Sequence, residues 1–186
     1  MPIFGIIASG IQGSLNAGSF ESIATVTVGS GGQSTITFSS IPSTYTHLQI
    51  RYIMRSDSGG YGKITFNSDT TGSNYYTHNL AGGGTSASGT SFAGSSYSAA
   101  LFEVYGIITN ANIFTGGVLD ILDYTSTSKN KTFRVLEGYD TNGGGVVEVG
   151  SGLWSATPAA INRIDLAISS GAFQQYSQFA LYGIKS

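Results

Sequence analysis

Apolar and polar residues alternate in short runs along most of the chain from Phe20 onward. Alternation with a period of two residues is typical of β-strands that bury one face. The run Thr46–Arg55 shows this pattern most clearly, with Ile53 as the exception. Its apolar face consists of Leu48, Ile50, Tyr52 and Met54. This continuous stripe predicts a strand in the centre of a sheet.

The remaining runs predict about ten further strands, separated by glycine-rich and polar turns. They are Phe20–Val28, Ser34–Phe38, Lys63–Phe66, Tyr75–Leu80, Ala99–Thr109, Ile113–Tyr124, Thr132–Tyr139, Gly145–Trp154, Ile161–Ile168 and Gln178–Ile184. No window combines a helical apolar period with capping residues, so we expect at most one short helical turn.

Glycine clusters mark several of the turns. Gly29–Gly32 lies between the first two predicted strands and predicts a β-hairpin there. Asn142–Gly144 predicts a second hairpin, because asparagine and glycine tolerate a positive φ. The segment Ala81–Ser96 holds Gly, Ser, Thr and Ala with one aromatic residue, Phe92. We expect it to be a mobile surface loop, because it has little to bury.

Many short strands joined by such turns predict either two sheets packed face to face, which we favour, or a closed barrel. We therefore predict an all-β fold, a two-sheet antiparallel β-sandwich of jelly-roll-like topology, in a single domain at residues 17–186. Residues 1–16 are rich in apolar side chains but lie outside the strand pattern. Two interpretations of this N-terminal arm stay open. It anchors the protein to a partner, or it adds a first strand over the domain's own core.

Composition narrows the classes of function. Charged residues make up 10% of the 186, the net charge is −2, and there is no cysteine. Disulfides and thiolate metal sites are therefore excluded, and no basic patch invites nucleic acid. The N-terminal residues lack the basic start of a signal peptide and are too glycine-broken to span a bilayer. We expect no membrane insertion, and synthesis in a reducing cytoplasm.

The low content of charged residues bears on how the protein associates with copies of itself. Globular domains carry about 25% charged residues, so this surface is unusually neutral. Such a surface suits a protein that packs beside copies of itself. The alternative is a neutral polar surface without that role.

The two histidines, His47 and His78, lie on different predicted strands. His47 falls on a polar face, and His78 shares a face with Tyr76 and Leu80. Neither has the spacing of a zinc site, and no nucleophile elbow precedes a helix. We expect no metal site, no cofactor and no serine triad.

Carboxylates are the other candidates for catalysis. Asp120 and Asp123 are predicted on opposite faces of one strand, and Glu103, Glu137 and Glu148 lie in three separate strands. Any two could meet across a sheet, as the carboxylates of sandwich-fold glycosidases do. The sequence around them shows no aromatic-rich cleft, so we expect no catalytic residues and a protein that is not an enzyme.

Two further features have a functional and a structural interpretation. Asn67, Asp69 and Asn74 share one polar turn and could bind Ca²⁺, but such side chains commonly cap turns, and the calcium-loop pattern is absent. Trp154 could stack on a sugar ring, whereas a tryptophan beside Leu153 at a strand end is more often part of a core. The structural interpretation is favoured in both cases.

Four segments carry a family resemblance. They are FESIATVTVGSGGQSTITFSSIPSTYTHLQIR (Phe20–Arg51), FNSDTTGSNYYTH (Phe66–His78), VLDILDYTSTSKNKTFR (Val118–Arg134) and SQFALYGIKS (Ser177–Ser186). Together they resemble small virion surface proteins of tailed bacteriophages, of the head decoration or tail fibre type. The resemblance runs through most of the chain after the arm, and it implies a context rather than catalytic positions.

The resemblance implies a non-enzymatic virion structural protein, either a capsid decoration (cement) protein or a fibre protein. Such proteins project from the particle as homo-oligomers, and a homotrimer is common to both types. The N-terminal arm would then contact other virion proteins. The alternative is a tail fibre receptor-binding module that recognises host surface glycans during host attachment.

Overall fold

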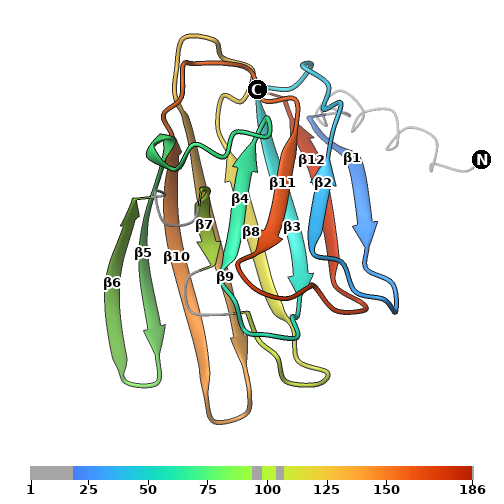
Figure 1. Ribbon diagram of the computed structural model, residues 1–186, viewed down its shortest axis with the longest axis vertical. Coiled ribbons are helices and arrows are strands. Elements are labelled where there is room, and N and C mark those ends of the chain that lie inside the picture. Colours follow the sequence, from blue (N-terminus) through green and yellow to red (C-terminus); the bar gives the residue numbers. More distant parts are fainter. Residues whose placement is uncertain (1–18, 94–97, 104–106, 186) are drawn as a thin grey trace, which may run out of the picture.

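The computed structural model describes residues 19–93, 98–103 and 107–185, which form two β-sheets packed face to face (Figure 1). The predicted arm at residues 1–16 lies outside this part of the chain. The strands are β1 (Phe20–Thr27), β2 (Thr35–Phe38), β3 (His47–Met54), β4 (Gly62–Phe66), β5 (Tyr75–Gly83), β6 (Ser86–Ala93), β7 (Ala100–Glu103), β8 (Thr115–Ile121), β9 (Lys131–Asp140), β10 (Gly145–Trp154), β11 (Ile164–Ile168) and β12 (Gln178–Ile184).

Among the described residues the one helical element is a 3₁₀ turn, η1 (Gly72–Asn74), as the lack of helical periodicity predicts. A helix with the length and apolar character needed to cross a membrane is not found in the described ranges.

The larger sheet has eight strands in the order β1-β12-β3-β8-β9-β10-β5-β6, and the smaller has four in the order β2-β11-β4-β7. Neighbouring strands are antiparallel throughout. The predicted all-β, two-sheet antiparallel sandwich is confirmed. β7 of the smaller sheet contacts β10, β5 and β6 of the larger one.

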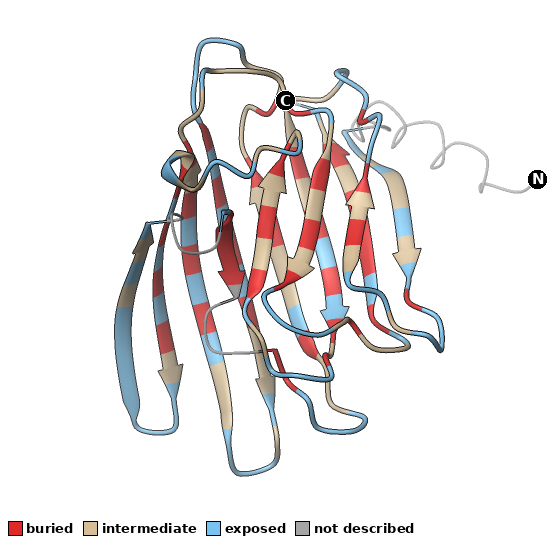
Figure 2. Cartoon of the chain, viewed as in Figure 1, coloured by how far each residue is buried: buried red, intermediate tan, exposed pale blue. Residues whose placement is uncertain are grey.

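The alternation along β3 matches its prediction. Leu48, Ile50 and Met54 are fully buried and Tyr52 is nearly so, whereas Ile53 is 47% exposed. β3 lies between β12 and β8, inside the larger sheet, so its predicted central position is confirmed. Figure 2 shows the same alternation of buried and exposed residues in other strands.

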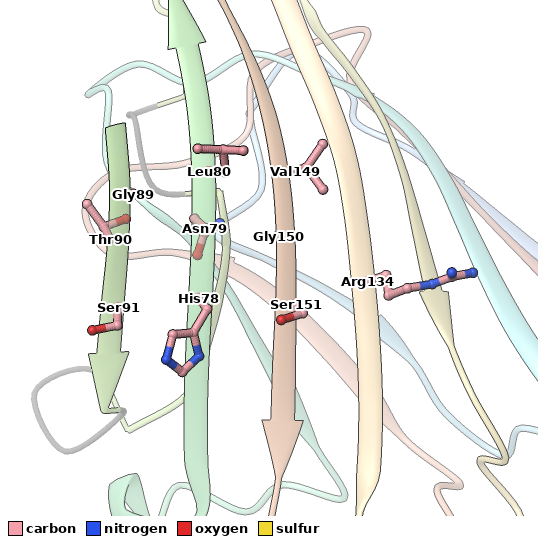
Figure 3. A pocket seen from close by; sticks show the side chains of 10 residues that line it. All are labelled: His78, Asn79, Leu80, Gly89, Thr90, Ser91, Arg134, Val149, Gly150 and Ser151. Carbon is pink, nitrogen blue, oxygen red and sulfur yellow. The ribbon is translucent and has the colours of Figure 1, made fainter. Parts of the chain in front are cut away.

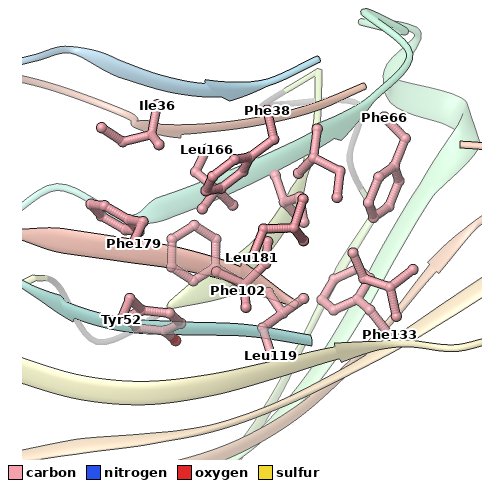
Figure 4. Close-up of a cluster of buried hydrophobic side chains, with 14 of the residues drawn as sticks. Ile36, Phe38, Tyr52, Phe66, Phe102, Leu119, Phe133, Leu166, Phe179 and Leu181 are labelled. Atoms are coloured by element: carbon pink, nitrogen blue, oxygen red, sulfur yellow. The ribbon is translucent and has the colours of Figure 1, made fainter. Parts of the chain in front are cut away.

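The two inner faces meet in one apolar core (Figure 4). Its members include Ile36, Phe38, Phe66, Phe102 and Leu166 from the smaller sheet and Tyr52, Leu119, Phe133, Phe179 and Leu181 from the larger. Burial of each such side chain stabilises the fold by roughly 1.5–3 kcal/mol. The contact between these two faces therefore holds the sandwich together.

The hairpin predicted around Gly29–Gly32 is wrong. β1 pairs with β12 in the larger sheet, whereas β2 pairs with β11 in the smaller one. The glycine turn, closed by a hydrogen bond of 3.1 Å from Gly32 N to Gly29 O, carries the chain from one sheet to the other. A hairpin and a crossing between sheets need the same turn residues and the same alternation, so the pattern does not separate them.

The second predicted hairpin is confirmed. β9 and β10 pair up to Asp140 and Gly145, and the turn between them has Asn142 at φ 59° and Gly143 at φ 130°. These are the positive φ values that asparagine and glycine adopt at low cost.

The mobile loop predicted at Ala81–Ser96 is wrong as far as Ala93. β5 continues to Gly83, and β6 pairs with it along the edge of the larger sheet. Backbone hydrogen bonds to β5 hold this edge strand, although its small side chains bury little. The predicted strand Ala99–Thr109 is also too long, because residues 107–109 are not in a strand; residues 104–106 lie outside the described part of the chain.

Candidate functional site

The β9–β10 hairpin reverses the usual arrangement of polar and apolar residues near its middle. Glu137 and Glu148 lie directly opposite each other and are only 4% and 2% exposed. Leu136 and Val149, each one residue away, also lie opposite each other but are 56% and 54% exposed. A half-buried sheet ordinarily places apolar residues inward and polar ones outward. We call Glu137 and Glu148 the glutamate pair.

Neutral donors from other strands of the larger sheet donate hydrogen bonds to both carboxyl groups. The Tyr52 hydroxyl in β3 donates to Glu137 Oε2 at 2.6 Å. The Asn79 amide in β5 donates to Glu148 Oε1. Hydrogen bonds to a buried carboxyl group lower the cost of removing it from water. The pair is therefore built into a group of polar contacts that extends from β3 to β5 in the larger sheet.

Two glycines make this network possible. Tyr52, Gly117 and Glu137 occupy one row across adjacent strands. A Cβ atom on Gly117 would lie 2.3 Å from Cζ of Tyr52, so the tyrosine ring crosses β8 through the space that the glycine leaves. A Cβ on Gly150 would likewise lie 2.7 Å from Asn79 Nδ2. Each donor reaches its carboxyl group over a glycine.

A small cavity adjoins the glutamate pair. It has a volume of about 10 Å³, which is room for about one water-sized particle. Its lining is Thr115, Glu137, Gly138, Tyr139, Val146 and Glu148. Thr115 is 2% exposed, and its hydroxyl has no hydrogen-bond partner among the described residues. The cavity is far too small for a sugar ring, so this carboxylate pair does not form a glycosidase cleft.

The sequence left open which glutamates meet. The structure brings Glu137 and Glu148 together, while the backbone of Glu103 pairs with Gly62 in the smaller sheet. Sequence reasoning missed Thr115 and Asn79 as neighbours of the pair, because only the strand register reveals them. The glycines inside predicted strands are the one sequence feature that hints at close packing there.

On the opposite face of the same strands lies an exposed apolar surface, which we call the outer patch. It consists of Leu80, Leu136, Val147 and Val149, all 54–60% exposed. Val149 lies directly opposite Leu136 on one side and Leu80 on the other, so three adjacent strands contribute a continuous row. Contiguous exposed apolar side chains commonly mark a surface for association.

A shallow hollow of about 600 Å³ adjoins the outer patch (Figure 3). Leu80 and Val149 form part of its lining, and His78, Arg134 and Ser151 add polar groups. Tyr76 is 41% exposed and lies two residues from His78 on the same face of β5. The prediction that His78 shares a face with Tyr76 and Leu80 is thereby confirmed.

The other titratable candidates form local contacts. His47 Nδ1 accepts a hydrogen bond of 2.9 Å from the backbone N–H of Asp123. The Lys129 ammonium group, 2.6 Å from the Asp123 carboxylate, lowers the pKa of that carboxyl group. Asp120 forms an ion pair of 3.2 Å with Arg134. In the part of the chain that the structure describes, no cluster of three or more His, Asp or Glu side chains could hold a metal.

The polar turn before β5 has the structural role that the sequence favoured. Asp69 Oδ1 accepts a hydrogen bond from Thr71 N at 2.9 Å. Asp69 Oδ2 accepts hydrogen bonds from Asn74 Nδ2 at 2.9 Å and Trp154 Nε1 at 2.7 Å. Asn67 Oδ1 accepts from the backbone of Asn162. These oxygens cap the turn and tie it to β10.

Trp154 belongs to the core. It is 5% exposed, and its ring lies 5.7 Å from that of Phe66. The interpretation of Trp154 as a sugar-stacking residue is therefore wrong.

No protein-family model matches this chain, and no curated protein matches its sequence closely enough to count as a relative.

Asp69→Asn should destabilise the fold by about 1–3 kcal/mol at neutral pH, because an amide cannot accept at both positions where Asp69 does. Burial tends to raise the pKa of Asp69, but hydrogen bonds from Trp154 and Asn74 outweigh it and lower the pKa. The stabilisation is complete above the carboxyl group's ordinary pKa and is lost as pH falls through the lowered value. Thermal unfolding at several pH values should show the variant approaching the wild type in acid. Asp140→Asn, at the exposed end of β9, controls for the lost charge, because the amide oxygen can still accept the hydrogen bond that Asn142 N donates to Asp140 Oδ1.

Gly117→Ala should destabilise the fold by about 1–3 kcal/mol, because the new methyl group would displace the Tyr52 ring. Gly116→Ala is a matched control, since a Cβ there meets nothing within 4 Å. Denaturant unfolding of the two variants measures the difference. Equal stability would show that Tyr52 does not need the space above Gly117.

Proposed function

We propose that this protein is a non-enzymatic structural protein of a bacteriophage virion. It acts at the particle surface as a homo-oligomer, in the manner of a capsid decoration or fibre protein. The outer patch is the observation that most supports this proposal.

The patch has the chemistry of a contact between copies. Val149 lies at its centre, and its neighbours Leu136 and Leu80 extend the apolar row across β9, β10 and β5. The Asp120–Arg134 ion pair lies at its border. A central apolar region with a polar rim is the usual composition of a protein interface. The nearly uncharged surface of the chain adds little repulsion between copies.

Other parts of the proposal rest on the sequence. We infer that residues 1–16 anchor the protein to other virion proteins, and that the oligomer is a trimer, as the resemblance implies. The chain changes sheet at each step from β1 to β5. This alternation supports a jelly-roll-like topology, which is common in viral surface proteins.

Val149→Lys should weaken self-association at least about tenfold, because a charge at the centre of the patch would be buried without a partner. Sedimentation equilibrium over a range of concentrations measures the constant and the number of copies. Thr25→Lys places the same charge on the same sheet face, four strands from β9 along the sheet. It should associate like the wild type. A wild-type protein that stays monomeric at high concentration would contradict the proposal.

A glycan-binding module is the second candidate, and the hollow beside the patch favours it. Tyr76 offers an exposed ring in an adjoining hollow of about 410 Å³, which shares His78 and Ser151 with the first. Aromatic faces with adjacent polar groups suit sugar rings. This site replaces Trp154 in that hypothesis.

The glycan hypothesis predicts saturable binding of the wild type on an array of bacterial surface glycans. Tyr76→Ala should lose most of that binding, because it removes the exposed ring. Tyr176→Ala is the control, since Tyr176 is 67% exposed but lines neither of the two hollows. Binding to no glycan, or equal loss in both variants, would exclude the hollow as a sugar site.

A further inference from the structure

We propose that the glutamate pair binds a divalent cation with hard-oxygen preference, Ca²⁺ being the ion that fits best, in the cavity that Glu137, Glu148 and Thr115 line. This inference is independent of self-association and of glycan binding. It goes against the sequence-based expectation of no metal site, which considered only local spacing.

The charge of the two carboxyl groups favours a bound cation. Glu137 and Glu148 lie directly opposite each other on neighbouring strands, and both are at least 96% buried. Opposed residues in an antiparallel pair have Cβ atoms about 4.5–5.5 Å apart. Two carboxylates that close and that deep repel strongly. Tyr52 and Asn79 donate hydrogen bonds to these carboxyl groups, and both of these donors are neutral. A divalent cation between the carboxylates would balance both charges.

The buried hydroxyl of Thr115 also favours a ligand in this cavity. Thr115 lines the same cavity and is 2% exposed, yet its Oγ1 has no hydrogen-bond partner among the described residues. A buried hydroxyl group without a hydrogen-bond partner destabilises the folded state by about 1–3 kcal/mol. A ligand bound to Thr115 Oγ1 would remove this cost. Thr115 Oγ1 is a neutral oxygen, and neutral oxygens commonly complete the coordination sphere of Ca²⁺ beside carboxylates.

The volume of the cavity and the oxygen donors around it favour Ca²⁺ over other metal ions. The cavity of about 10 Å³ holds about one particle, so it would take a largely dehydrated ion. All side-chain donors around it are oxygens, which excludes a preference for soft metals. Ca²⁺ accepts irregular oxygen geometry, whereas Mg²⁺ demands a near-ideal octahedron and gives up water reluctantly. Two carboxylates, each with one oxygen held by a hydrogen bond, form such an irregular oxygen site and favour Ca²⁺.

The experiment uses the full chain after treatment with a chelator. CaCl₂ at a hundred times the Kd of Ca²⁺ for the site should raise the Tm of the protein by roughly 5–10 °C. NaCl at the same ionic strength should leave the Tm unchanged. Tb³⁺, which replaces Ca²⁺ at oxygen sites, should show luminescence sensitised by Tyr52 and Tyr139, and excess Ca²⁺ should quench it.

Three variants separate the site from general effects. Glu148→Gln keeps the shape but removes one charge, and it should lose both the Tm rise and the Tb³⁺ luminescence. Thr115→Val removes only the hydroxyl and should weaken Ca²⁺ binding at least about tenfold, at the cost of one oxygen ligand. Thr132→Val, on an exposed position of β9, should bind Ca²⁺ like the wild type.

Two outcomes would overturn the proposal. In the first, Ca²⁺ leaves the Tm of the wild type unchanged and Tb³⁺ shows no sensitised luminescence, while a lower pH stabilises the wild type but not Glu148→Gln. The two carboxyl groups then share a proton instead of binding a cation. In the second, neither cations nor acid stabilise the wild type, and the cavity holds water. Self-association can be present or absent in each case, so failure here is distinct from failure of the proposed function.

Discussion

The register between β9 and β10 determines both unusual faces of this protein. Side chains alternate along a strand, so the register that turns Phe133 and Trp154 into the core also turns Glu137 inward and Val149 outward. A slip by one residue would reverse all of them. Burial of two large aromatic side chains contributes roughly 3–6 kcal/mol, twice the value for one, and hydrogen bonds offset part of the cost of burying the carboxyl groups. The aromatic residues therefore fix the arrangement that the glutamates must accept.

Much of the fold is predictable from local pattern. The bounds of β10 and β12 and the buried face of β3 follow directly from alternation, because a strand that packs on one side must present one apolar face. Strand partners are different. The turn at Gly29–Gly32 suits a hairpin as well as a crossing, and only the packing of both sheets decides between them. β6 is harder still, since an edge strand of small residues is held by backbone hydrogen bonds that leave no mark in the sequence.

Even less of the candidate site than of the fold could be predicted from the sequence. Glu137 and Glu148 are visible as separate strand residues, but their meeting depends on a register that one sequence does not fix. Gly117 and Gly150 are also visible inside predicted strands, where glycine is otherwise unfavourable. Their role becomes clear only when Tyr52 and Asn79 are seen crossing over them. Interior glycines beside unexplained charges are therefore the sequence feature most worth following in strands of this kind.

The glutamate pair and the outer patch occupy opposite sides of the same two strands, which gives a reason for them to occur together. A cation held between Glu137 and Glu148 would cross-link β9 and β10 at the level of Leu136 and Val149. Those aliphatic side chains would then be presented on a stiffer surface. A stiffer surface loses less conformational freedom when a second copy binds, and affinity rises accordingly. Under both proposals, the cation bound to the glutamate pair on the inner face of the hairpin holds the outer patch in the conformation that binds a second copy.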